Sequence, residues 1–335
     1  MIISENLKRR FVKDNSLPIK IFDSPVFENR LAMFETQFKA KSKYDAFVKM
    51  LEENFPDEGA YFDEHHRVAD AALAYMQENE HFQYFSQKKD MKQFDVDQQG
   101  FPGNSVFKDT NVGKYLLSID MVKANFTAMR FYNPEIFGGA ETYEDFIGMF
   151  TNLEHIKKSK YIRQMIFGNI VPKRQQKYEK FLMNKVLEGF FKYTPFCKKN
   201  VEYFGTDEIV FDITEFVIDG KLTPGIDLMV YELVDRFCER GINIRCEYYH
   251  LKKVYGTSGY MKEYVFGTAD KGVEFKCLEP LEYPFVIRAY EGSAYTGDEY
   301  YFTYEGRLAK LMQPIEVSFS DVLKEEVEEW KLHSL

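Results

Sequence analysis

In the middle of the chain, two short stretches alternate apolar with polar positions. The first is Tyr115–Asp120, and the second is Val201–Asp212, whose two apolar runs are joined through Gly205 and Thr206. Runs of Val, Ile, Tyr and Phe joined by a Gly-containing turn are typical of a β-hairpin. The pattern therefore predicts a strand over 115–120 and a hairpin over 201–212, with Asp207 at its tip.

Apolar residues elsewhere recur at helical spacing or in further strand-like runs. Helices are predicted over 43–54, 67–77, 121–132, 160–171, 172–189 and 223–241, and near 319–332. Strands are predicted over 242–247, 249–255, 260–266 and 273–278. Thr223 is expected to cap the helix over 223–241, with Pro224 in its first turn and Gly241 at its end. Asp95–Asn104 is rich in turn-forming residues and is expected to be a linker or long loop.

Two of the predicted strands carry a single acid at one end, Asp120 in the first and Asp207 at the hairpin tip. Strands that bring one carboxylate each to a common edge can hold a pair of divalent cations, as two-metal phosphoryl transfer requires. The alternative for Asp207 is a solvated turn residue, because acids are common in turns. Asp212 is a weaker partner for Asp207, because positions five apart along a strand point to opposite faces.

Composition indicates a folded protein, with 45% hydrophobic and 17% aromatic residues. No apolar run approaches the length of a membrane span, and the segment Met1–Lys8 lacks a signal-peptide pattern, so a cytoplasmic protein is expected. The four cysteines are widely spaced, which favours reduced core thiols over a zinc site. For Asp63–Arg67, an exposed loop or helix start is favoured over a metal cluster.

The net charge of −9 argues against a protein that coats nucleic acid. Residues 151–200 are the exception, with twelve Lys or Arg against three Glu. The helices predicted there carry Lys160, Arg163 and Gln164 on one, and Lys173, Arg174, Lys177 and Lys180 on the next. Lying between the two Asp-bearing strands, they predict a lid that grips phosphate groups, with a solvated helix face as the alternative.

Several segments, in order, resemble the motifs of family B DNA polymerases. Ser118–Asn125 is similar to the first palm motif, which begins with a metal-binding Asp at a strand end. Lys160–Gly168 keeps the Lys, the aromatic residue and the Gly of the finger-helix motif, and Tyr203–Glu208 resembles the second palm motif. Lys252–Gly256 is similar to the lysine-rich segment that contacts the primer end.

The resemblance implies an α+β fold: a polymerase-like palm, which is an antiparallel sheet with packed helices, short helical fingers and a mixed N-terminal region. It divides the chain into an α-rich region of unknown role over 1–109, a palm over 110–278 with fingers inserted at about 140–195, and a small β/α region over 279–335. Residues 1–109 lack the paired acidic motifs of a proofreading exonuclease.

The implied activity is nucleotidyl transfer: a nucleic-acid 3′ end is extended with nucleoside triphosphates. Asp120 and Asp207 would be the catalytic metal ligands for Mg²⁺ or Mn²⁺. The nucleotide would be bound by Lys160, Arg163, Gln164, Asn125 and Met121, the last through its carbonyl oxygen. The primer, with or without a template, would be bound by Lys252, Lys253, Tyr255, Lys173 and Arg174.

The sequence also departs from the family pattern. Gly205 replaces the first Asp of the second palm motif, Glu208 replaces its Ser, and Asn125 stands where the family has the Tyr that excludes ribonucleotides. The reduced core fits a viral or mobile-element protein, in the host cytoplasm if viral. A catalytically degenerate nucleic-acid-binding or interaction subunit is one alternative, and a phosphotransferase or nuclease using Asp207 and Asp212 is another. Template dependence, sugar selectivity and oligomeric state stay open.

Overall fold

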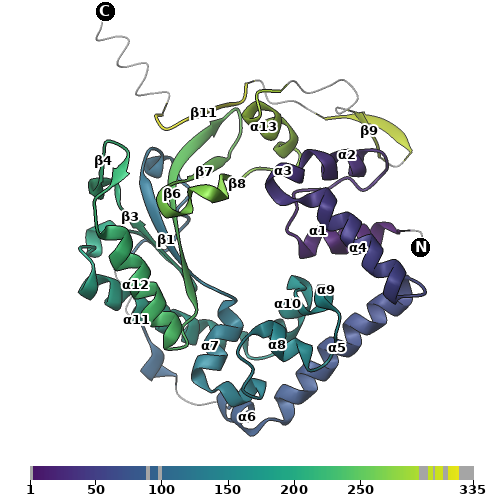
Figure 1. Ribbon diagram of the computed structural model, residues 1–335, viewed down its shortest axis with the longest axis horizontal. Helices are drawn as coiled ribbons and strands as arrows, with labels where there is room; N and C mark the ends of the chain where they lie inside the picture. The colour runs from purple at the N-terminus through teal and green to yellow at the C-terminus, as the bar shows by residue number, and fades with distance from the viewer. Residues whose placement is uncertain are drawn as a thin grey trace, which may run out of the picture.

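A computed structural model describes residues 3–87, 91–96, 100–293, 301–304, 306–311 and 316–323. The N-terminal part is helical, with α1 Glu5–Asp14, α2 Val26–Met33, α3 Glu35–Phe38, α4 Ala40–Asn54, α5 Glu58–Glu78 and α6 Glu80–Ser86. In Figure 1 α4 and α5 lie across from the sheet, α3 lies beside β8, and α7, α8 and α10 connect the two sides.

The sheet is antiparallel throughout its described pairs, in the order β2-β3-β1-β6-β7-β8, and β11 also pairs with β6. Its strands are β1 Tyr115–Met121, β2 Val201–Phe204, β3 Glu208–Asp212, β6 Ile244–Tyr255, β7 Tyr260–Tyr264, β8 Val273–Lys276 and β11 Ser318–Ser320. Two small hairpins are separate from it: β4 Val217–Ile218 with β5 Lys221–Leu222, and β9 Tyr301–Tyr304 with β10 Arg307–Lys310. An α+β fold with an antiparallel sheet and packed helices is thereby confirmed.

The remaining helices follow particular strands. Between β1 and β2 lie α7 Ala124–Tyr132, α8 Tyr143–Gly148, α9 Glu154–Lys157, α10 Lys160–Gly168 and α11 Pro172–Tyr193, while α12 Ile226–Glu239 precedes β6 and α13 Tyr283–Tyr290 follows β8. Short 3₁₀ helices are η1 Lys92–Phe94, η2 Asp109–Asn111, η3 Pro134–Phe137, η4 Lys198–Asn200, η5 Thr214–Phe216 and η6 Phe266–Lys271. The described parts of 95–104 are neither helix nor strand, as predicted.

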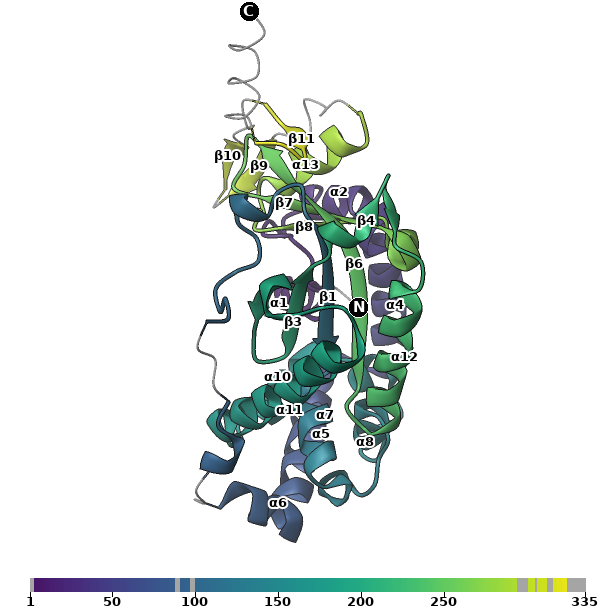
Figure 2. The same ribbon diagram turned by 90° about the vertical axis from the view of Figure 1, so that its left-hand side faces the viewer.

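Alternation along β1 decides which face of the sheet is covered. Leu117, Ile119 and Met121 point into a core that also contains apolar residues of α11 and α12. Figure 2 shows α12 running beside β6. The other positions of β1, Ser118 and Asp120 among them, face the opposite side. The helices α11 and α12 therefore cover one face of the sheet. On the other face Leu116 is buried in a smaller apolar cluster with Val106, Val210, Tyr249, Leu251 and Tyr260, and polar side chains gather around Ser118 and Asp120.

Two further cores cross the boundaries predicted at 109 and 278. One joins α1, α2, α4 and the start of α5 to Val254, Met261, Phe275 and α13. The other joins the rest of α5 and α6 to residues of 126–171. The N-terminal helices therefore pack against both the sheet and the inserted helices.

Several local predictions are wrong. Strands 242–247 and 249–255 form the single strand β6. Gly225, at φ 87°, is the N-cap of α12, because the Thr223 hydroxyl donates to the Phe216 carbonyl instead. Phe319 lies in β11, and 324–332 of the predicted C-terminal helix lie outside the described residues. All four cysteines are free thiols, but Cys197 and Cys277 are exposed rather than in the core.

Candidate active site

The two predicted acids meet where β1 ends. Asp120 pairs with Glu208 in the β1–β3 register, and the Met121 N–H donates to the Asp207 carbonyl at 2.8 Å. The β1 strand end and the hairpin tip are therefore joined by the backbone. The structure brings Asp120 and Asp207 to one edge of the sheet.

Asp120 is crowded by other charges. The Arg245 guanidinium on β6 contacts its carboxylate through Nε at 3.0 Å and Nη2 at 2.9 Å. Burial raises the pKa of Asp120 to about 6 despite Arg245, and the neighbouring carboxylates of Glu208, Asp207 and Glu247 add to the rise. A cluster of acids that disfavours its own ionisation is stabilised by an added cation.

Asp207 differs from Asp120 in being exposed, and its carboxylate makes no hydrogen bond or ion pair with a described residue. The Asp207 charge acts on buried Glu179 of α11. Burial is the main cause that raises the pKa of Glu179, a hydrogen bond from Gln175 opposes the rise, and the negative charge of Asp207 adds to it. Glu208, next to it, accepts a 2.6 Å hydrogen bond from the Ser118 hydroxyl. Ser118 thus positions Glu208, the residue that replaces Ser of the second palm motif.

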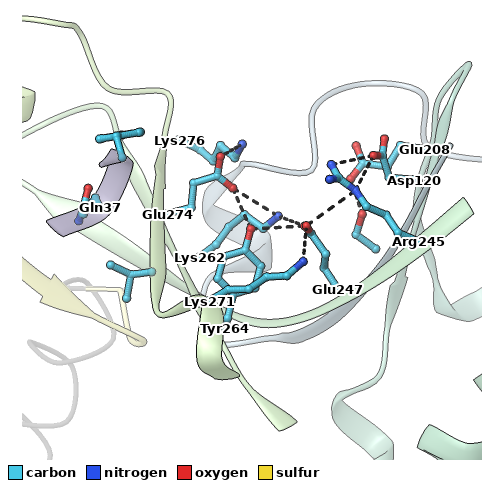
Figure 3. Close-up of a pocket in the computed structure, with 13 residues that line it drawn as sticks. Gln37, Asp120, Glu208, Arg245, Glu247, Lys262, Tyr264, Lys271, Glu274 and Lys276 are labelled. Atoms are coloured by element: carbon cyan, nitrogen blue, oxygen red, sulfur yellow. Dashed lines mark hydrogen bonds and ion pairs between the residues drawn. The ribbon is translucent and has the colours of Figure 1, made fainter. Parts of the chain in front are cut away.

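A cleft of about 480 Å³ extends from this edge across the face of the sheet that lies opposite α11 and α12. Figure 3 shows its charged walls, in which β7 and β8 stand opposite Asp120, and Gln37 of α3 closes one side. Its charged lining residues are Asp120, Glu208, Arg245, Glu247, Lys262, Lys271, Glu274 and Lys276. Acids cluster at the Asp120 end, and lysines follow along the cleft.

Glu247 connects the two ends of the cleft. It is bound by the Lys262 and Lys271 ammonium groups, each at 3.0 Å, and Arg245 lies 4.0 Å away. Burial would raise the pKa of Glu247, but Lys262 and then Lys271 outweigh it and lower that pKa to about 2. Lys262 is almost fully buried. Glu247 therefore fixes two cations beside the acidic edge.

These cleft residues were missed by the sequence reasoning. None of the four lies in a motif: Arg245, Glu247, Lys262 and Lys271. The register of β6 with β1 and β7 places the first three, and the packing of η6 against β6 and β7 places Lys271. One signal was available: Glu247 and Lys262 interrupt strands that are otherwise rich in aromatic and aliphatic residues.

The helix α10 carries the predicted nucleotide-binding residues, with Lys160 and Gln164 exposed and Arg163 half-buried. Lys160 donates to the Ser16 hydroxyl at 3.1 Å. Arg163 lies 5.9 Å from the Tyr143 ring, and so does Lys123, which follows Asp120 by three residues. Of the three residues on α10, Arg163 is therefore the one connected to the end of β1, through the Tyr143 ring that it shares with Lys123.

Two other predicted nucleotide-binding residues follow Asp120 directly. The Met121 side chain is buried in the covered core, so only its backbone is available to a ligand. Asn125 is half-buried in the first turn of α7.

The basic residues of α11 contact different parts of the chain. Lys180 donates to the Phe204 and Gly205 carbonyls at 2.6 Å each, and burial lowers its pKa to about 8. Lys177 pairs with Asp95. Arg174 donates to the Met91 sulfur at 3.4 Å, while Lys173 is exposed in the first turn. Lys180 therefore supports the hairpin that carries Asp207.

The predicted primer contacts lie at the far end of β6. Lys252 pairs with Glu263 at 2.9 Å, Lys253 pairs with Asp109 at 3.1 Å, and the Tyr255 hydroxyl donates to the Val322 carbonyl. Lys252 is seven positions from Arg245, roughly 23 Å along an extended strand. Lys262 and Lys271 are the lysines that line the cleft with Asp120.

The alternative acid, Asp212, lies at the other end of β3 from Asp207. It pairs with Lys114 at 3.3 Å and accepts a hydrogen bond from the Thr214 N–H. Asp212 therefore has a structural role.

Within the described residues, no group of three or more His, Cys, Asp or Glu side chains is arranged to hold a metal ion. Two carboxylates nevertheless suit Mg²⁺, because this ion usually keeps several waters and takes further oxygens from a phosphate. The exposed Asp207 carboxylate and the raised pKa of Asp120 fit such a group.

No family model, curated protein or solved structure matches the chain in comparisons with known proteins. Among the helices that the structure describes, none combines the length and the apolar character that crossing a membrane requires. A function must therefore be inferred from the residues of the site itself.

Proposed function

We propose that this chain is a metal-dependent nucleotidyltransferase that extends a nucleic-acid 3′ end with nucleoside triphosphates. The observation that carries the proposal is the junction of the Asp120 and Asp207 segments, held by the Met121–Asp207 backbone bond, with Asp120 lining a charged cleft. The family B resemblance rests on the same residues. Its palm-like arrangement is part of the proposal.

Asp120 and Asp207 would hold Mg²⁺ or Mn²⁺, which when bound lowers the pKa of the attacking 3′-hydroxyl and stabilises charge on the transferring phosphate. The protein contributes position. Lys271, which is 40% exposed and fixed by Glu247, would present its ammonium group to a phosphate in the cleft, and buried Lys262 would add positive charge behind it. Arg163 on α10 contributes a further cation near the end of β1.

The proposal is tested by incorporation of labelled ribo- and deoxyribonucleoside triphosphates onto RNA and DNA ends, with Mg²⁺ or Mn²⁺. Asp207→Asn should reduce incorporation by at least about 100-fold, because positioned electrostatic groups contribute about that much to the rate. Asp212→Asn is the matched control, since it makes the same change at the other end of the same strand. Undiminished incorporation by Asp207→Asn would remove the proposal.

A second candidate is a catalytically degenerate nucleic-acid-binding or interaction subunit. Arg245 favours it, because its guanidinium already neutralises Asp120. This candidate predicts no incorporation by the wild-type chain and nucleic-acid binding that is indifferent to Mg²⁺ and triphosphate.

A further inference from the structure

A second basic surface lies on the helical layer that covers the opposite face of the sheet from the cleft. It is a groove of about 500 Å³ between α11 and α12, which we call the helical groove. Lys185, Lys192, Arg236 and Arg240 line it, with Glu188 as the one acid among the lining residues. Its charge is therefore strongly positive in a chain whose net charge is −9.

The floor of the helical groove is apolar. Leu233 and Phe237 of α12 reach it from the covered core. Gly189 of α11 allows this close packing, because a β-carbon there would lie 2.7 Å from the Phe237 ring. The hollow lies within the size range of small-molecule sites, so it can take a nucleobase with its sugar.

Tyr193 provides an aromatic surface among these cations. Its side chain is 51% exposed, and Lys192 lies 5.0 Å from its ring centre. The pKa of Tyr193 is lowered, first by the hydrogen bond and charge of Lys192 and then by Arg240 and Arg236. The same cations that would stabilise a phenolate can bind phosphate oxygens.

We infer that the helical groove binds single-stranded nucleic acid, with phosphates on Lys192, Arg236 and Arg240 and a base against Tyr193 and the apolar floor. Cations combined with an exposed aromatic ring are the recurring means of binding single strands without sequence preference. Glu232 pairs with Arg236 at 3.5 Å, but both side chains are more than half exposed, so a phosphate can compete for this guanidinium. Glu188 accepts a hydrogen bond from Asn184. A duplex would not present its bases to the hollow.

The inference does not require a catalytic role for Asp120 and Asp207. Binding is measured by fluorescence anisotropy with a labelled oligonucleotide of about ten nucleotides, within the usual site size, on the full chain carrying Asp207→Asn. Arg236→Gln combined with Arg240→Gln should weaken binding and reduce the slope of log affinity against log salt by about 1.4, or 0.7 for each lost phosphate contact. Tyr193→Ala should weaken binding at least about fivefold with little change in slope.

Lys41→Gln combined with Lys49→Gln is the matched control, because it removes the same charge from exposed positions on α4. Thermal unfolding checks that each variant is folded. The inference is overturned if the double arginine variant keeps wild-type affinity and salt slope, or if a labelled polyglutamate peptide binds the groove and the oligonucleotide does not. Loss of incorporation by Asp207→Asn with intact groove binding separates this result from the catalytic proposal.

Discussion

The Met121 N–H donates to the Asp207 carbonyl at 2.8 Å, one position beyond the Asp120–Glu208 pair. The bond fixes the hairpin tip to the end of β1 through the backbone. The Asp207 carboxylate is therefore placed by the turn and by Lys180, which donates to the Phe204 and Gly205 carbonyls. A ligand can use that carboxylate without breaking any contact that supports the turn.

The Tyr203 side chain leaves no room for a β-carbon at Gly205. A β-carbon at this position would lie 2.4 Å from the Tyr203 hydroxyl oxygen. We expect Gly205→Asp, which introduces the acid found at this position of the family B motif, to reduce the free energy of unfolding by about 1 to 3 kcal/mol, as overpacking does. Urea unfolding measures the effect.

A double-mutant cycle with Tyr203→Ser identifies the cause. If the contact is responsible, Gly205→Asp should cost much less in the Tyr203→Ser background. Equal costs in both backgrounds would instead assign the effect to repulsion between the new carboxylate and Asp207.

Lys262 and Glu247 form a buried ion pair in the cleft, with side chains 6% and 11% exposed. Lys262→Met should lower the free energy of unfolding by about 3 kcal/mol, because it leaves a buried carboxylate without one of its cations. Lys262→Met combined with Glu247→Met should recover most of that stability, since apolar residues replace both charges. Incorporation should stay low in both variants if the positive charge of Lys262 supports phosphate binding in the cleft, and recovered activity in the double variant would contradict that role.

Asp14 at the end of α1 caps α10 from another part of the chain. Its carboxylate accepts hydrogen bonds from the Ser159 hydroxyl and the Tyr161 N–H, each at 2.9 Å. We expect Asp14→Ala to cost about 1 to 2 kcal/mol of stability, as the loss of a cap does. It should also raise the KM for the triphosphate, because α10 carries Arg163.

Asp57→Ala is the matched control for this prediction. Asp57 caps α5 by accepting from the Ala60 N–H at 2.9 Å, so its loss should cost similar stability. Because α5 carries none of the proposed nucleotide contacts, the KM should not change. Equal KM values for the two variants would count against a nucleotide-binding role for α10.

Local patterns were enough to predict β1, the hairpin and the helices α10 and α11. These elements follow from the spacing of apolar residues and from the turn at Gly205, which involve only positions close together in the sequence. Predicting them therefore needs no knowledge of long-range contacts. The acids at the two strand ends suggested a common edge for Asp120 and Asp207, but the β1–β3 pairing itself was not predicted. What could not be predicted was the partner of each polar residue: Arg245 contacts Asp120, and Lys262 contacts Glu247, because of a strand register that the sequence does not state.

The same limit explains the errors in α12 and β6. Thr223 has the chemistry of a helix cap, but its hydroxyl is taken by a carbonyl seven residues away, so Gly225 caps the helix. The predicted break in 242–255 falls at Tyr248, next to the charged Glu247. Tyr248 is fully buried and Glu247 is paired with Lys262, so the strand continues through both positions. Tertiary contacts overrode local propensity in both cases.

His65 makes the chain sensitive to acid. It lies on α5, the helix that packs against α10, with its ring 4.3 Å from that of Tyr61. Burial is the main cause that lowers its pKa to about 3, and the charges of Arg10 and His155 add to it. Above pH 6.5 His65 is neutral in both the folded and unfolded states. As the pH falls below 6.5, the unfolded state binds a proton that the folded state cannot, so stability should fall by about 1.4 kcal/mol per pH unit.

Urea unfolding of wild type and His65→Phe at pH 7.5, 6 and 5 measures this contribution. The variant should be at least as stable as wild type at pH 7.5, because no described residue hydrogen-bonds the His65 ring nitrogens. It should lose less stability than wild type at pH 5, by about 2 kcal/mol. The exposed neighbour His66 provides the control, since His66→Gln should keep the wild-type pH dependence. A His65→Phe curve parallel to wild type would show that the imidazole is protonated in the folded protein, which would require α5 to move away from Arg10 and Tyr61.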